Sequence, residues 1–80
     1  MPLTKLAAGQ SAIIKEIIGG RGIVNRLDSL GIVPGKKITK ISSMMMRGPV
    51  VMRVGSTEIA LGYGMAAKIL VDIQLPAPGK

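Results

Sequence analysis

The stretch IIGGRGIVNRLDSLGIVPGKKI, residues 17–38, decides the fold because it joins two strands through one short helix. Its middle part predicts a helix over residues 21–30, in which Ile23, Leu27 and Leu30 share one face. An apolar face of this kind packs against the rest of a protein. We therefore expect these three side chains to hold the helix on a sheet.

The ends of this helix carry clear stop signals but unfavourable charges. Gly31 stands where a left-handed C-terminal cap is expected, and Pro34 prevents the helix from continuing. Pro34 and Gly35 then suit the two central positions of a type II turn. Arg21 at the start and Asp28 near the end both oppose the helix dipole. The helix should therefore depend on its apolar face for stability.

Five short segments are rich in β-branched residues or alternate between apolar and polar positions, which is typical of strands. They are residues 11–18, 36–42, 49–54, 57–61 and 68–73. The first segment does not alternate cleanly, which indicates a bulge or burial on both faces. In the second, Ile38 and Ile41 have opposite parity and leave the register open. Residues 62–66 can form one helical turn.

Alternation also predicts which side chains enter the core. The inward residues are expected to be Val50, Met52 and Val54, then Ile59 and Leu61, and finally Ile69, Val71 and Ile73. Gly55 and Ser56 form a two-residue hairpin turn with glycine first. At the start of the chain, Leu3 and Leu6 are expected to tuck a short segment against the core before a turn at Gly9.

The order of these elements predicts a mostly β fold: a small SH3-like β-barrel of about five strands with one inserted α-helix. Closure as a barrel is expected because it leaves few open strand edges. The 80 residues are enough for one domain, expected over residues 1–73. The tail QLPAPGK, residues 74–80, contains two prolines and a glycine and is expected to be flexible.

The composition argues against chemistry in this chain. It contains no cysteine and no histidine, which excludes the usual Cys/His zinc sites, thiol nucleophiles and imidazole bases. The four acids, Glu16, Asp28, Glu58 and Asp72, are dispersed singly, whereas Fe(II) sites favour clusters of histidine and carboxylate. We therefore expect no catalytic, cofactor or metal site and no enzymatic activity.

The net charge of +7 favours an anionic partner such as nucleic acid, anionic lipid or an acidic protein. The basic residues are nevertheless spread along the chain, and the longest basic run is Lys36-Lys37, so no binding patch is predicted. No apolar run reaches the roughly 18 residues needed to span a bilayer, and the opening MPLTKLAAGQ lacks a signal-peptide pattern. We expect a soluble, cytoplasmic protein.

A loop with three consecutive methionines, SMMMRG, follows the second predicted strand. Met44, Met45 and Met46 either fill the edge of the core or form an adaptable apolar surface for a partner, with Arg47 as a charged anchor. Arg26 either lies on a solvated face of the helix, or braces the following loop or contacts a partner carboxylate. These five residues are the candidate partner-binding site.

Three stretches together carry a more specific pattern. The motif RLxxLGxxPG begins at Arg26, a second stretch carries Gly48-Pro49, Gly55 and Ile59-Ala60-Leu61, and the last carries Ala66, Ile69 and Val71. In order and spacing, residues 1–73 resemble the FeoA family, the core domain of ferrous iron transport protein A. The segment MMMRGP departs from the commoner pattern, in which an acidic or small residue precedes the proline.

The resemblance implies an SH3-like barrel, a fold that also forms the C-terminal domain of iron-dependent repressors. It further implies a cytoplasmic accessory protein of bacterial ferrous iron uptake that binds FeoB, a membrane transporter with a GTPase domain. Two alternatives stay open: a basic SH3-like barrel that binds nucleic acid, and a stand-alone regulatory domain of a metal-dependent repressor. Nucleic acid is not expected as the partner, because such modules stack bases on aromatic side chains and Tyr63 is the only aromatic residue.

Overall fold

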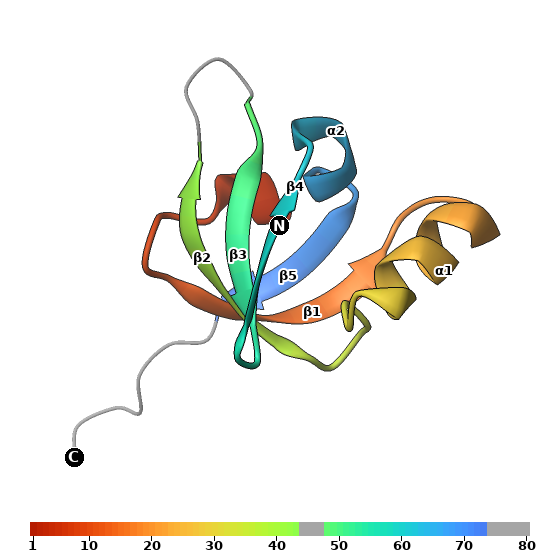
Figure 1. The fold of residues 1–80 in the computed structure, drawn as a ribbon, viewed down its shortest axis with the longest axis horizontal. Coiled ribbons are helices and arrows are strands. Elements are labelled where there is room, and N and C mark those ends of the chain that lie inside the picture. The colour runs from red at the N-terminus through yellow and green to blue at the C-terminus, as the bar shows by residue number, and fades with distance from the viewer. Residues whose placement is uncertain (44–47, 74–80) are drawn as a thin grey trace.

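The computed structural model describes residues 1–43 and 48–73. In chain order its elements are the 3-10 turn η1 (Leu3–Lys5), β1 (Ser11–Ile17), α1 (Arg21–Ser29), β2 (Lys37–Ser43), β3 (Val50–Val54), β4 (Thr57–Leu61), α2 (Tyr63–Ala66) and β5 (Ile69–Ile73) (Figure 1). A mostly β fold with five strands and a helix after the first strand is thereby confirmed. The single helical turn before the last strand is also present.

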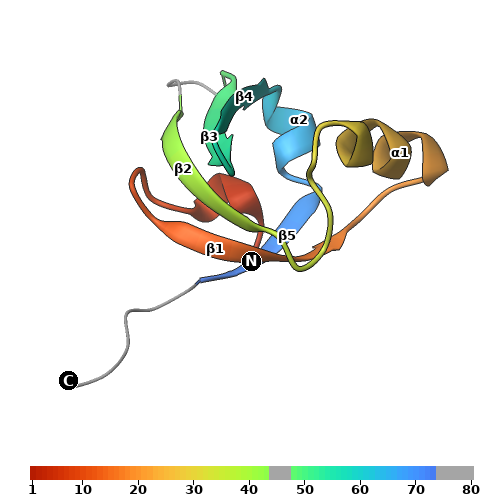
Figure 2. The ribbon, with the colours of Figure 1, turned by 60° about the horizontal axis from the view of Figure 1, so that its bottom comes forward.

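The five strands form one antiparallel sheet in the order β4-β3-β2-β1-β5. The sheet is strongly curved, so that β1 and β5 face β3 and β4 across the core (Figure 2). The free side of β5 is covered by the start of the chain, because Pro2 bridges to Leu70 and the backbones of Met1 and Val71 exchange hydrogen bonds of 3.0 and 2.7 Å. The curvature and this cover shorten the exposed edges of the sheet.

Two strands contain irregularities that the sequence pattern indicated. The pairing of β1 with β5 shifts register between Ile14 and Glu16, which confirms the bulge expected in the first strand. The pairing of β2 with β3 shifts between Lys40 and Ser42. This second shift falls at Ile41, so the opposite parity of Ile38 and Ile41 does not prevent both from being at least partly buried.

The core is built from aliphatic side chains and one methionine, and every helix and strand contributes to it. Its buried members are Leu3, Leu6, Ala12, Ile14, Leu27, Ile32, Ile38, Val50, Met52, Val54, Leu61, Ala66, Ile69 and Val71. Nearly all the inward positions predicted by alternation are thus confirmed. Ile59 is only partly buried against this core. Ile73 is the exception: it pairs with the buried Ala12 and has the right parity, but it ends its strand and is 37% exposed.

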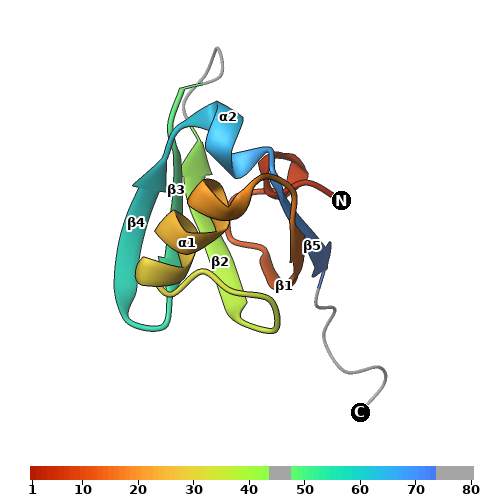
Figure 3. The same cartoon turned by 90° about the vertical axis from the view of Figure 1, so that its right-hand side faces the viewer.

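The helix is attached to the barrel differently from the prediction. Leu27 is fully buried and Ile23 half-buried, but Leu30 is 41% exposed, so the expected stripe ends at Leu27 and not at Leu30. The physical reason is the cap at Gly31, whose φ of +85° turns the chain and brings Ile32 into the core. The remaining residues of α1 are exposed; Figure 1 shows the helix projecting from one side of the sheet, and in Figure 3 it lies in front of the sheet.

Lys40 is buried inside this fold, with only 3% of its surface exposed. Its ammonium donates hydrogen bonds to the carbonyl oxygens of Leu6 at 2.6 Å and Thr4 at 3.2 Å. Its backbone pairs with the next part of the same segment, receiving a bond from Gly9 at 2.7 Å and donating one to Gln10 at 2.9 Å. One residue of β2 therefore makes hydrogen bonds along residues 4–10 of the opening segment.

Candidate functional site

The Pro34-Gly35 turn determines where the basic pair Lys36-Lys37 enters the sheet. Gly35 has a φ of +92°, and the Lys36 amide donates to the Val33 carbonyl at 3.1 Å, as the predicted turn requires. The Gly35 amide also donates to the Ile14 carbonyl at 2.7 Å, which ties the turn to β1. The two lysines are therefore held at the beginning of β2 and not on a free loop.

Strand register then brings a third cation beside this pair. Thr39 of β2 stands opposite Arg53 of β3 and, on its other side, opposite Ser11 of β1. The hydroxyl oxygens of Ser11 and Thr39 are 2.8 Å apart and share a hydrogen bond. Because neighbours in β2 such as Ile38 point into the core, Thr39 and Arg53 lie on the outer face of the sheet.

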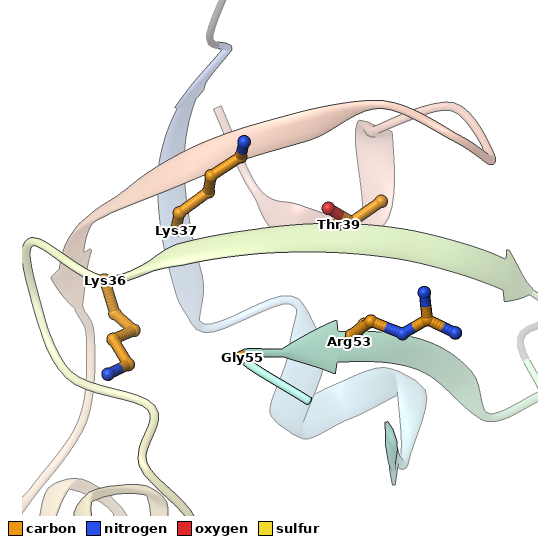
Figure 4. A pocket seen from close by; sticks show the side chains of 5 residues that line it. All are labelled: Lys36, Lys37, Thr39, Arg53 and Gly55. Carbon is orange, nitrogen blue, oxygen red and sulfur yellow. The ribbon is translucent and has the colours of Figure 1, made fainter. Parts of the chain in front are cut away.

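These residues surround a pocket of about 390 Å³ beside the start of β2 and the end of β3. We call it the cationic pocket; its lining residues are Lys36, Lys37, Thr39, Arg53 and Gly55 (Figure 4). The lining side chains are basic or neutral. The nearest counter-charge is Glu58 on β4, whose carboxylate accepts a hydrogen bond from Arg53 at 3.0 Å while both side chains stay about half exposed, at 55% and 52%.

The structure places Arg26 on the exposed surface of α1, where its backbone carbonyl accepts a bond from the Ser29 hydroxyl at 2.7 Å. This position fits a solvated face or a partner contact. Met44, Met45, Met46 and Arg47 lie outside the described residues. The predicted partner-binding site therefore stays a prediction, and the sequence reasoning did not identify the cationic pocket.

The described residues show no cluster of three or more histidine, cysteine, aspartate or glutamate side chains that could hold a metal ion. Glu16, Asp28, Glu58 and Asp72 each lie on a different element, namely β1, α1, β4 and β5. Among residues 1–43 and 48–73, moreover, no helix is long and apolar enough to cross a membrane.

The curved five-stranded sheet with its helix after the first strand defines a small SH3-like β domain with a basic outer face. The model of the FeoA domain matches residues 1–73. The chain belongs to the FeoA family, whose members are small accessory domains of ferrous iron transport.

Two relatives place the family in iron transport. The putative Fe(2+) transport protein A of Methanocaldococcus jannaschii is 38% identical over 71 residues, which cover 89% of this chain and 84% of the relative. A fusion protein of Porphyromonas gingivalis, Fe(2+) transport protein A joined to Fe(2+) transporter FeoB, is 35% identical over 74 residues. The match covers 91% of this chain but only 9% of the fusion protein.

Solved structures confirm the fold. A crystal structure of the iron uptake regulatory protein FeoA has a TM-score of 0.83 and 33% identity, and covers 91% of this chain and 95% of its own. The FeoA of Stenotrophomonas maltophilia in complex with zinc, described as a prokaryotic SH3 domain protein, has a TM-score of 0.76 and 28% identity, covering 90% and 89%. A manganese-dependent transcriptional repressor shares the fold alone, with a TM-score of 0.84 at 17% identity over 92% of this chain and 41% of the repressor.

Proposed function

We propose that this protein is a non-enzymatic accessory factor of ferrous iron uptake that acts by binding the FeoB-type GTP-binding membrane transporter. The observation that carries the proposal is the Porphyromonas gingivalis protein, in which a related domain and FeoB are parts of one chain. Two domains that are fused in one organism often associate as separate chains in another. The protein would then work in the cytoplasm and reach the membrane only through its partner.

The chemistry of the chain supports a binding role. It has no histidine or cysteine, and the described acids are scattered over four elements, so the described residues assemble no general acid–base pair and no metal centre. A small barrel with a projecting helix and a basic face can still bind a protein. The proposed contact surface consists of Arg26 on α1 together with Met44, Met45, Met46 and Arg47.

The test is co-purification from native membranes. Affinity-tagged protein is expected to retain the FeoB-type transporter after mild detergent extraction, and an untagged strain gives the background. Deleting the gene should reduce Fe(II)-dependent growth, and a plasmid copy should restore it. If the tagged protein captures no transporter while it complements growth fully, a direct complex is not how it acts.

Nucleic-acid binding is the second candidate, and the cationic pocket together with the net charge of +7 favours it. Single-stranded nucleic acid is usually held by aromatic platforms as well as by cations. The only aromatic residue, Tyr63, lies on α2 and not among the lining residues of the pocket. A salt-sensitive mobility shift with RNA at moderate ionic strength would favour this candidate. The similarity to repressors is a similarity of fold alone, so it does not add a third candidate function.

A further inference from the structure

The cationic pocket gathers three positive side chains that are distant in sequence. Lys36 directly precedes β2, Lys37 is its first residue, and Arg53 lies on β3, where it pairs with Thr39 of β2. Because β2 and β3 are paired in a fixed register, the three charges stay around the same pocket. Such a concentration of like charge lowers the stability of the free protein slightly and attracts an anion.

Among the described residues Glu58 pairs with Arg53, so the positive charge of the pocket is only partly neutralised. Arg53 shares one hydrogen bond with Glu58, but half of each side chain is exposed, and a guanidinium has five N–H donors. Arg53 can therefore donate hydrogen bonds to a second carboxylate while it keeps its bond to Glu58. Gly55 borders the opening with free space where a Cβ would stand, so a ligand can approach the backbone there.

The directions of the side chains indicate the shape of the ligand. Figure 4 shows Lys36 and Lys37 leaving their strand on opposite sides, while Arg53 extends along β3. The three charged groups border a broad opening and do not converge on one point. One small oxyanion would reach only some of them, whereas an extended ligand with several spaced negative charges can reach all three.

We propose that the cationic pocket binds an acidic, extended segment of a protein partner, with carboxylates placed against Lys36, Lys37 and Arg53. The lining residues of the pocket are other residues than those proposed above for contact with the transporter. This inference depends on the proposed function in one respect only: the proposed function is what identifies the partner. Charge complementarity of this kind mainly accelerates association and makes it sensitive to salt.

The test measures binding of a fluorescent peptide of alternating glutamate and serine at low ionic strength, with a glutamine–serine peptide as the neutral control. The variant K36Q/K37Q/R53Q is expected to bind the acidic peptide about tenfold more weakly than the wild type. The matched control is K5Q/R21Q/K68Q, which also removes two lysines and one arginine, all exposed and all outside β2 and β3. It should change the affinity by less than about threefold, because it removes only general attraction.

Each possible result of this binding test either supports or contradicts the proposed role of the pocket. Equal losses of affinity in the two triple variants would show that net charge alone attracts the peptide. No binding of the peptide by the wild type would also contradict the proposal that the pocket binds acidic segments. If an oligouridylate of matched charge binds more tightly than the peptide and is lost in K36Q/K37Q/R53Q, the pocket is a nucleic-acid site. Should that variant unfold, K37Q alone is expected to lose about twofold to threefold. A pocket that binds the peptide in a protein that captures no transporter would refute the proposed function and leave the pocket intact.

Discussion

The amide of Ile32 donates a hydrogen bond of 2.9 Å to the carbonyl oxygen of Leu27, and both side chains are fully buried. The Gly31 amide adds a bond of 2.9 Å to the Asp28 carbonyl, which completes a Schellman cap with its usual apolar pair. This cap is how α1 is anchored, because most of the helix is exposed. The cap therefore sets the stability of the helix on the barrel.

Leu27→Ala should lower the free energy of unfolding by about 2–4 kcal/mol, since it removes a fully buried leucine side chain. Leu30→Ala is the matched control, because Leu30 is only three residues away but largely exposed, and it should cost less than about 1 kcal/mol. Chemical denaturation of the two variants measures both values. Equal losses would mean that Leu27 is not the anchor.

Gly31→Ala should destabilise the protein by about 1–2 kcal/mol, because an L-residue is strained at a φ of +85°. Space is not the cause, since the added Cβ would meet its nearest neighbour, on Val54, at an ordinary 4.0 Å. Gly22→Ala, within the helix, has open space and no positive φ and should be neutral or stabilising by up to about 1 kcal/mol. Thermal melts that rank the two variants the other way would contradict the cap.

Lys40→Met should cost about 1–2 kcal/mol, because the carbonyl oxygens of Thr4 and Leu6 lose their donor while the apolar stem is kept. Hydrogen exchange should rise at the amides of residues 5–10 more than elsewhere, since this segment is what Lys40 holds. The exposed Lys15→Met serves as the control and should leave both readouts nearly unchanged. Faster exchange spread evenly over the sheet would show that Lys40 acts only through global stability.

The folded protein should bind Fe(II) weakly at most, because it has no histidine or cysteine and its acids are dispersed. Anaerobic titration calorimetry is expected to show no stoichiometric site of micromolar or tighter affinity. A site of that strength would contradict the prediction and would mean that oxygen or thioether ligands come together in the folded protein.

Arg47→Ala, Met45→Ser and Arg26→Ala should each weaken co-purification with the transporter while shifting the thermal melt by little. Partner contacts of this kind concentrate in a few apolar and arginine anchors, so single truncations should have large effects. Arg21→Ala, at the other end of α1, is the control for a general loss of charge. Full retention of the transporter by all three variants, with normal Fe(II)-dependent growth, would remove these residues from the contact.

The sequence by itself determined the order of the elements, the helix stop at Gly31 and the turn at Gly35, because positive φ and strand alternation are local properties. It also predicted the SH3-like fold and, through the resemblance, the family. Only the tertiary structure decided that Ile32 replaces Leu30 in the core and that Lys40 is buried. It likewise gathered Arg53 beside the Lys36-Lys37 pair. The cap at Gly31 places Ile32, but its burial needs the core that the rest of the chain forms. The positions of Lys40 and Arg53 depend on the register between strands, which long-range hydrogen bonds and bulges set and which no local pattern in the chain records.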